Sequence, residues 1–261
     1  MGHPQVAAFA RTANGGAQPT REIAGQNTLS TRTMHDMGYD PVADEIVVPQ
    51  FFAFAILTFA GDADGNVTPK RIIMGPKTQI NNPHAVTVDP VNGEYYVPGR
   101  ANDHRVLVFK RERAGDVEPI RILNTPGEPA RVGVDPVHNV TIVSGGGELL
   151  IYDRTASGDA KPLRVITIPE SEGNRGTGLM AVDADRGMIF VASGASGRYE
   201  ADDYVAVYSV FDNGTVPPRF TIGVGTLKDI RGVALDVKNK NVIVTDKTLN
   251  AIVTFNAPEA F

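Results

Sequence analysis

Short runs of β-branched and aromatic residues recur along the whole chain, and each is bounded by Gly, Asn, Asp or Pro. Runs of four to six such residues between turn formers are typical of strands, and no stretch of comparable length shows helical periodicity. One set of runs ends in an aromatic residue, as in ILTF and VLVF. These aromatic residues are Phe9, Phe59, Phe109, Tyr152, Tyr208 and Phe255.

Three further kinds of run accompany the aromatic ones in a fixed order, and we name the expected strands by type. Type a ends in aspartate, b follows after a short turn, c ends in the aromatic residue, and d follows a Pro-x-Arg motif. This order recurs at intervals of 43 to 56 residues. Repeated four-stranded antiparallel units predict an all-β fold, a β-propeller with one unit in each blade. The a-type strands end at Asp40, Asp89, Asp135, Asp183 and Asp236, and the d-type arginines are Arg21, Arg71, Arg121, Arg164 and Arg219.

The residues between the runs are those that tight turns require. Asp-Pro joins a to b in three repeats, where the aspartate can accept backbone N–H groups two residues on and the proline presets φ. Gly, Asn and Asp join c to d in the repeats, which is typical of β-hairpins. Residues that recur in every repeat serve the repeat itself, so we interpret the arginines and the aspartates as structural.

A small residue stands two positions before each a-type aspartate, between larger apolar neighbours. In a propeller the sheets converge toward an axis, so the innermost strand is covered on both faces. Close packing then requires small side chains on one face. The pattern therefore favours radially packed blades over a sandwich, whose strands alternate apolar and polar. The small residues are Gly38, Thr87, Gly133, Ala181 and Ala234.

The strand count raises the question of how the ring closes. The chain starts with c-d (Val6 to Gly25), ends with a-b-c (Gly232 to Asn256), and has six c-type runs against five of each other type. We expect one domain, residues 1–261, with five blades and a closing blade shared by the N- and C-termini, because sharing removes free sheet edges. Six blades, or a fragment of a longer propeller, are the alternatives. The surplus c-type strand could also pair with another copy.

Three segments resemble the NHL and YVTN-type bacterial propeller repeats of the lactonase-like superfamily. They are PHAVTVD (Pro83 to Asp89), IFVASG (Ile189 to Gly194) and YVAVY (Tyr204 to Tyr208). The resemblance implies a propeller over nearly the whole chain. It does not select a function, because such propellers include binding scaffolds, protein-interaction domains, lactonase-like proteins and metal-dependent lyases.

The composition limits which classes of partner and which cellular compartment we expect. The net charge of −5 argues against a nucleic-acid binder, and without cysteine there is no disulfide and no thiolate site. No run of eighteen apolar residues exists, so we expect no membrane span. The N-terminus has no basic region followed by an apolar stretch. We favour a secreted or periplasmic protein after signal removal over a cytoplasmic one, although absence of cysteine fits either compartment.

Two histidines give the sequence its candidate metal site. His35 and His84 occupy equivalent places before successive a-type strands, with Asp36 beside the first. Imidazoles from neighbouring blades, with a carboxylate, could bind a divalent metal such as zinc. The resemblance supports this idea, since NHL-like lyases that bind zinc use histidines from different blades. Ordinary hydrogen-bonded channel histidines are the alternative, and we expect no resident cofactor.

The loops at the channel mouth carry the candidate ligand-binding residues, because variable loops on a rigid scaffold usually carry binding. The segment Phe51-Phe52-Ala53-Phe54 places three aromatic residues where other repeats are polar, which indicates an exposed patch for a ligand or a protein, or else a plug of the channel. Clustered carboxylates at Glu200, Asp202 and Asp203 also suit calcium, and a solvated loop is the alternative. The other candidates are Arg100, Asp103, His104, Arg131, Tyr199 and Arg231.

We find no nucleophile elbow, zinc-protease motif, phosphate loop or dinucleotide fingerprint. The sequence therefore favours a non-catalytic module that binds a protein or a small molecule at the channel mouth. The first alternative is a metal-dependent hydrolase or lyase at the channel. The second is an assembly protein that uses the surplus strand, so we expect a monomer or a strand-paired oligomer.

Overall fold

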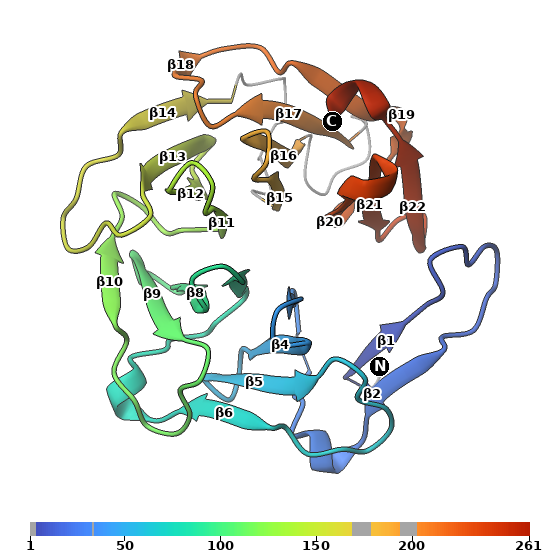
Figure 1. Ribbon diagram of the computed structural model, residues 1–261, viewed down its shortest axis with the longest axis vertical. Helices are drawn as coiled ribbons and strands as arrows, with labels where there is room; N and C mark the ends of the chain where they lie inside the picture. The colour runs from blue at the N-terminus through green and yellow to red at the C-terminus, as the bar shows by residue number, and fades with distance from the viewer. Residues whose placement is uncertain (1–3, 33, 169–178, 194–202) are drawn as a thin grey trace. The chain divides into compact units, whose positions relative to one another are not determined.

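The protein is an all-β chain with the fold of a five-bladed β-propeller, as predicted (Figure 1). The computed structural model describes residues 4–32, 34–168, 179–193 and 203–261. The chain divides into two compact units, one of Met1–Ala101 with Leu107–Ile120 and the other of Asn102–Val106 with Arg121–Phe261. That these residues form a single domain stays a prediction, and each unit is described by itself.

The first unit begins with an antiparallel c-d pair, followed by a complete a-b-c-d sheet in the order β3-β4-β5-β6. A second sheet has the order β10-β9-β8-β7, and the boundary between the units runs through β9. The strands of these sheets are β1 (Gln5–Ala8), β2 (Arg21–Ala24), β3 (Gly38–Asp40), β4 (Glu45–Gln50), β5 (Ala55–Ala60), β6 (Arg71–Met74), β7 (Thr87–Asp89), β8 (Glu94–Pro98), β9 (Arg105–Lys110) and β10 (Arg121–Asn124), with 3-10 turns η1 (Gln26–Thr28) and η2 (Pro76–Thr78). Strand β10 and the first two residues of β9 belong to the second unit.

The second unit has two further complete sheets and one three-stranded a-b-c sheet, β20-β21-β22. Its two core clusters consist mainly of Val, Ile, Leu and Phe from the b- and c-type strands. The strands are β11 (Arg131–Asp135), β12 (Val140–Gly145), β13 (Glu148–Asp153), β14 (Arg164–Thr167), β15 (Met180–Asp183), β16 (Met188–Ser193), β17 (Asp203–Ser209), β18 (Gly214–Thr215), β19 (Phe220–Leu227), β20 (Ile230–Asp236), β21 (Asn241–Asp246) and β22 (Ala251–Asn256), with 3-10 turns η3 (Val237–Asn239) and η4 (Pro258–Ala260).

The two terminal pieces are separate sheets, the pair β1-β2 and the sheet β20-β21-β22. Both β1 and β22 are c-type strands, so the predicted surplus of one c-type strand is present. That the two termini share one closing blade stays a prediction.

The a-type aspartates have the structural role that the sequence predicts. Asp40 is fully buried, and its Oδ1 accepts hydrogen bonds from the N–H groups of Val42 (3.0 Å) and Ala43 (3.1 Å). Its carboxylate thereby closes the turn between β3 and β4 and satisfies backbone donors that would otherwise lack partners. Asp89 and Asp135 make the same pair of bonds, and Asp236 accepts from the third residue on.

A glycine in four of the five c-to-d hairpins links its blade to the d-type strand before it. Gly65 donates to Glu22 O (2.7 Å) and accepts from Ala24 N (3.1 Å), so the hairpin covers the outer edge of β2. Its φ of 74° lies in the left-handed region, where glycine avoids the steric cost that other residues meet. This repeated contact protects edges that would otherwise be free to pair. The equivalent parallel pairings are Ile73↔Gly115, Leu123↔Gly158 and Ile166↔Gly214.

The small a-type residues allow neighbouring a-type strands to approach closely. A Cβ added at Gly38 would lie 2.6 Å from Val88 Cγ2, on the next a-type strand of the same unit. At Gly133 it would lie 2.7 Å from Met180 Sδ and 2.8 Å from Val182 Cγ2. Because side chains do not fit at these distances, the small residue is a packing requirement at both places.

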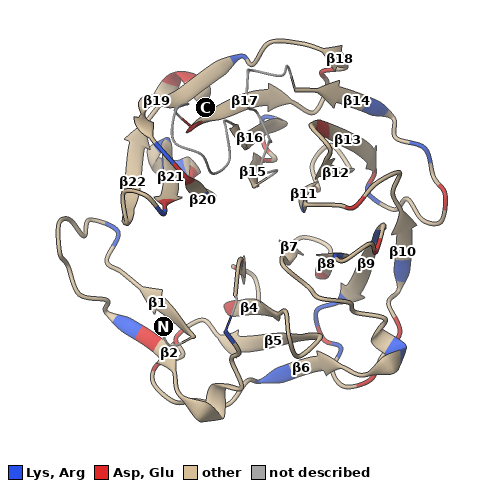
Figure 2. Cartoon of the chain, turned by 180° about the vertical axis from the view of Figure 1, so that it is seen from behind, with Lys and Arg blue, Asp and Glu red and all other residues tan. Residues whose placement is uncertain are grey.

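The d-type arginine Arg71 holds a charged partner inside its blade, and Figure 2 shows basic positions on β2, β6, β10 and β14. Arg71 donates to both carboxylate oxygens of Glu45, and its Nη2 lies 3.5 Å from Tyr95 Oη on β8. Glu45 also pairs with Lys70 (Nζ–Oε1 2.7 Å). Burial alone would raise the pKa of Glu45, but the hydrogen bonds from Arg71 and Lys70 outweigh it and lower the pKa below its ordinary 4.5.

This ion pair predicts a pH dependence of stability. A carboxylate whose folded pKa is lowered stabilises the protein above its unfolded pKa, and the contribution disappears as the pH falls through the folded pKa. We therefore expect the loss of stability caused by Arg71→Ala to be largest near neutral pH and to shrink at pH values below about 4. Urea unfolding of both proteins across this range measures it. An Arg71→Ala effect that is constant with pH would contradict the assignment.

Candidate functional site

The turn between β4 and β5 is formed by Phe51, Phe52, Ala53 and Phe54. It starts from Gln50, whose carbonyl accepts from Ala53 N at 3.2 Å. Phe54 has a φ of 51°, in the left-handed region that bulky residues avoid at a cost of about 1–2 kcal/mol. Glycine would meet no such cost, so the turn keeps an aromatic residue at a strained position. Strain of this kind is common at functional sites.

Phe51 anchors a cluster of rings that includes both candidate histidines. The rings of His35 and His84 stack, with centroids 4.3 Å apart and planes 15° from parallel. Phe51 meets His84 edge-on at 4.4 Å. The structure thus brings together residues from three loops of the first unit, including the two histidines that the sequence placed in equivalent positions.

Phe52 extends this cluster to the surface. Its ring meets Phe51 edge-on at 4.8 Å, and Arg32 Cζ lies 5.3 Å from its centroid, in cation–π geometry. Phe52 is 49% exposed. We call Arg32, His35, Phe51, Phe52 and His84 the aromatic–imidazole cluster; its outer part combines exposed apolar area with a positive charge.

Two amide side chains hold the loops around the cluster. Gln50 Oε1 accepts from Thr31 N (2.6 Å) and from Thr31 Oγ1 (3.1 Å). Asn82 Nδ2 donates to Phe51 O at 3.4 Å. Gln50 is fully buried, and its Nε2 has no hydrogen-bond partner among the residues that the structure describes. Hydrogen bonds of these two amide side chains therefore hold the loops around the cluster.

The stacked histidines do not share a metal in this arrangement. Lone pairs of imidazole lie in the ring plane, so nearly parallel rings do not direct them to one point, and chelation would require one ring to rotate. Asp36 accepts from Met37 N at 2.9 Å. In the part of the chain that the structure describes, no three His, Asp or Glu side chains are grouped to hold a metal. The metal role of these three residues stays a prediction.

An apolar pocket of about 330 Å³ is lined by the second half of the same turn. Ala53 and Phe54 line one wall, and Phe54 is 44% exposed. The other walls come from the end of β6, η2 and the loop that follows. They are formed by Met74, Gly75, Pro76 and Ile80. The pocket thus offers an apolar surface for one side chain of a ligand, since such sites are mostly apolar.

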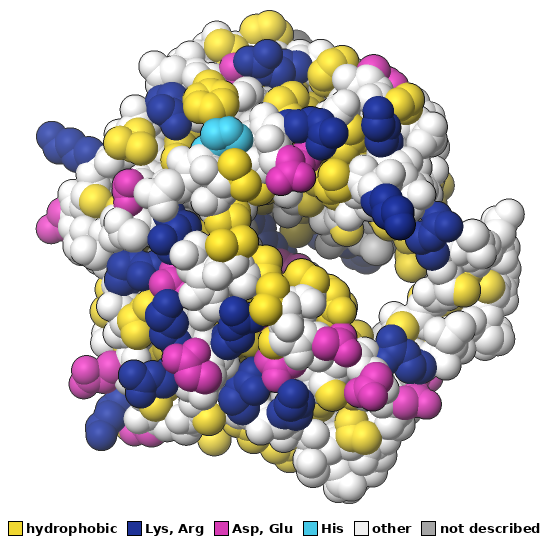
Figure 3. Space-filling model, in the orientation of Figure 1, with side chains coloured by type: hydrophobic (Ala, Val, Ile, Leu, Met, Phe, Trp, Pro, Cys, Tyr) yellow, Lys and Arg dark blue, Asp and Glu magenta, His cyan; other side chains and the backbone are white. Residues whose placement is uncertain are grey.

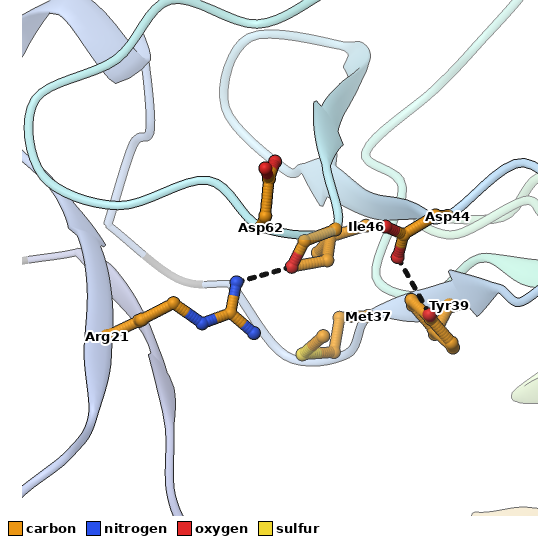
Figure 4. A pocket seen from close by; sticks show the side chains of 7 residues that line it. Arg21, Met37, Tyr39, Asp44, Ile46 and Asp62 are labelled. Atoms are coloured by element: carbon orange, nitrogen blue, oxygen red, sulfur yellow. Dashed lines mark hydrogen bonds between the residues drawn. The ribbon is translucent and has the colours of Figure 1, made fainter.

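A second pocket, of about 370 Å³, is lined by Arg21, Met37, Tyr39 and four other residues (Figure 4). Arg21 Nη1 donates to Gly61 O at 2.5 Å, and Tyr39 Oη donates to Asp44 at 2.8 Å. That hydrogen bond raises the pKa of Tyr39. Both hydrogen bonds join residues of the lining to one another. The remaining lining residues are Asp44, Ile46, Gly61 and Asp62.

The other candidate residues make contacts within their own units. In the first unit, the carbonyl of Arg100 accepts from Asn81 Nδ2 (3.3 Å). In the second unit, Asp103 is buried and pairs with Arg105 (2.7 Å), and the carbonyl of exposed His104 accepts from Thr125 N (2.8 Å). These contacts hold the loops in which Arg100, Asp103 and His104 lie.

Two predicted arginines and Asp203 make contacts within the second unit. Arg131 Nη1 donates to Ala130 O (2.7 Å), and exposed Arg231 pairs with Asp229 (3.0 Å). Tyr199, Glu200 and Asp202 lie outside the described residues. Asp203 is buried and accepts from Ile230 N (2.8 Å), and burial raises the pKa of its carboxyl. The calcium idea stays a prediction.

Two further observations bear on partners. In the described residues no helix is both long and apolar enough to cross a membrane. On the face drawn in Figure 3, basic and acidic side chains are interspersed. That nucleic acid is not a partner stays a prediction.

Comparisons with known proteins bear on the fold. No protein-family model matches the chain, and no curated protein matches it. Among solved structures, a hydrazine synthase of Kuenenia stuttgartiensis is similar over 92% of this chain and 67% of its own, with a TM-score of 0.64 and 15% identity. Similarity at that identity shows the fold alone. Membership of the NHL or YVTN-type repeats stays a prediction.

Sequence reasoning found the histidines and the phenylalanine turn but missed several neighbours. Arg32, Met74 and Ile80 belong to loops and strand ends that carry no motif. Sequence reasoning missed the second pocket because it interpreted Arg21 as a structural arginine of the repeat. It interpreted Asp62 as part of a c-to-d hairpin. The signal that could have indicated the pocket beside Phe54 was weak. It was Met74, an apolar residue at the exposed end of a d-type strand.

Proposed function

We propose that this protein is a non-catalytic binding module that holds a partner polypeptide at the Phe51–Phe54 turn. An apolar side chain of the partner enters the pocket beside Phe54, and an acidic residue next to it meets Arg32. The strained, half-exposed Phe54 is the observation that carries the proposal. Exposed aromatic anchors beside a pocket are typical of protein-binding surfaces.

The positive charges near the turn favour a partner polypeptide with acidic residues. Arg32 lies over Phe52 of the turn, and exposed Lys77 follows the pocket residue Pro76. Two cations beside an apolar pocket favour a ligand with the opposite charge, because complementary potentials speed encounter and reject like-charged ligands.

Binding of short fluorescent peptides tests this proposal. Each peptide carries a central Phe or Leu, flanked either by Glu or by Lys. We expect fluorescence anisotropy to show that the Glu-flanked peptides bind. Phe54→Gly should raise their dissociation constants by about ten-fold or more, as loss of an aromatic anchor does. Phe54→Gly also removes the left-handed strain, so the folded protein should be no less stable.

The matched control is Phe9→Ala, which removes an exposed phenylalanine outside the cluster. We expect it to leave peptide affinity unchanged. Equal binding of the Glu- and Lys-flanked peptides would remove the charge argument. If Phe54→Gly binds every peptide as tightly as the unaltered protein does, the proposal is wrong.

The close approach of His35 and His84 favours one alternative, a metal-dependent hydrolase or lyase centred on these residues. Rotation of one ring would direct both imidazoles to a single cation. Titration with zinc, followed by calorimetry, tests this alternative. Saturable binding that is lost in His84→Ala supports it, and absence of zinc binding excludes it.

A further inference from the structure

Met74 is the last residue of β6 and forms part of the apolar pocket beside Phe54. The strand register places Met74 opposite Ala55, the residue that follows Phe54 in the chain. Met74 is 51% exposed. Its side chain therefore belongs to the pocket and is also accessible to small solutes.

The neighbouring wall of the pocket, at Gly75 and Pro76, is held in place by hydrogen bonds. Lys77 N donates to Asp116 Oδ1 at 2.7 Å, and Thr78 Oγ1 donates to Gly75 O at 2.6 Å. A Cβ added at Gly75 would lie 2.5 Å from Asp116 Cγ. The backbone of this wall is therefore fixed against the c-to-d hairpin that follows β9.

Met74 is the flexible part of the lining. Ile80 is only 7% exposed, and Ala53 and Phe54 belong to the turn that β4 and β5 hold. A methionine side chain is unbranched, has three rotatable bonds and adapts its shape to a neighbouring group. We therefore expect the fit between the pocket and an apolar group to depend on the Met74 thioether.

Exposure distinguishes Met74 and Met37 from the other methionines of the described residues. Met37 is 44% exposed and lines the second pocket. Met34 packs against a core cluster of the first unit, and Met180 and Met188 pack against those of the second unit. Met37 therefore offers an exposed methionine that is not part of the lining beside Phe54.

We infer that oxidation of Met74 to its sulfoxide by hydrogen peroxide switches off binding at this pocket. In this step a lone pair on Met74 Sδ attacks one oxygen of the peroxide. A sulfur–oxygen bond forms, the oxygen–oxygen bond breaks, and the second oxygen leaves as water with both protons. The sulfur loses two electrons, and the peroxide gains them. The inference rests on the proposed function, because it concerns regulation of the same pocket.

The polarity of the sulfoxide explains the expected loss of binding. Oxidation converts a flexible apolar side chain into a polar one. The lining around it is apolar, and the N–H of Met74 itself already donates to Gly115 O at 3.1 Å. A bound apolar side chain would therefore bury the new oxygen away from water, which is unfavourable for a polar group without a hydrogen-bond partner. In the free protein the oxygen remains hydrated, so the fold is kept.

Limited treatment with hydrogen peroxide tests this inference, with a methionine-free, Glu-flanked phenylalanine peptide as the probe. Mass spectrometry of proteolytic fragments should show that Met37 and Met74 are oxidised before the packed methionines. Protein oxidised at Met74 should bind the peptide about ten-fold or more weakly in fluorescence anisotropy. Methionine sulfoxide reductases, supplied with a dithiol, should restore the affinity because they remove the added oxygen.

Two leucine variants provide matched controls. Met74→Leu keeps an apolar side chain of similar volume, so it should bind the peptide within about two-fold of the unaltered protein and retain this affinity after peroxide. Met37→Leu should lose affinity after peroxide as the unaltered protein does. Circular dichroism should show that both variants and the oxidised protein are folded.

Protection by the peptide links Met74 to the pocket by a second measurement. Bound peptide should slow oxidation of Met74 in proportion to the fraction of protein that is bound, and it should leave the oxidation rate of Met37 unchanged. Equal rates for Met74 with and without saturating peptide would contradict the inference.

The outcomes separate this inference from the proposed function. If the protein still binds the peptide with full affinity after Met74 is oxidised, the inference is wrong and the proposed function stands. A loss of affinity that Met74→Leu does not prevent also overturns the inference, since oxidation at another residue is then its cause. If the unoxidised protein binds no peptide, the proposed function is wrong and the inference fails with it.

Discussion

Gly133→Val is expected to lower the free energy of unfolding by about 2–3 kcal/mol, as overpacking of a filled core does. The new Cβ would lie 2.7 Å from Met180 Sδ and 2.8 Å from Val182 Cγ2. Both neighbours belong to β15, the next a-type strand, which packs against β11. Either these side chains leave their rotamers or the two strands separate, and both changes reduce packing. Urea unfolding measures the loss.

Gly127→Val is the control for this prediction. Nothing lies within 4 Å of a Cβ added at Gly127, and this glycine has no left-handed φ. We expect its effect to stay within about 0.5 kcal/mol, as for other surface changes. Equal effects of the two substitutions would show that close approach of the a-type strands is not what the small residue permits.

Arg71→Ala should destabilise the protein by about 3 kcal/mol, because it leaves the Glu45 carboxylate buried with its main partner removed. Glu45 is only 4% exposed, and Arg71 is the partner that donates to both of its oxygens. Unlike an exposed pair, this one cannot exchange its partner for water. The free energy of unfolding in urea at neutral pH is the measurement.

Lys70→Ala provides a matched control on the same carboxylate. Lys70 contacts Glu45 Oε1 at 2.7 Å, but its side chain is 47% exposed. We expect a loss below about 1 kcal/mol, as for exposed ion pairs. The double variant Glu45→Ala, Arg71→Ala should lose less than the sum of the two single variants, because the two residues share one interaction. A simple sum would mean that the pair is not coupled.

The candidate site was only partly accessible to sequence reasoning. The Phe51–Phe54 turn was visible because three aromatic residues interrupt a polar loop position. Its geometry was not, because a left-handed φ at a phenylalanine is imposed by the strand register that holds the turn. Likewise the sequence paired His35 with His84 but could not decide whether their nitrogens converge or their rings stack.

By itself the sequence determined the repeat, the order of strands within each blade, and the turns that join them. These features depend on local chemistry: β-branched runs form strands, buried aspartates bind nearby N–H groups, and glycine adopts a positive φ. Only the tertiary structure decided that Glu45 accepts hydrogen bonds from Arg71 and that Met74 and Ile80 form a pocket with Phe54. Each joins residues from different loops or strands, and their distances depend on how those elements pack.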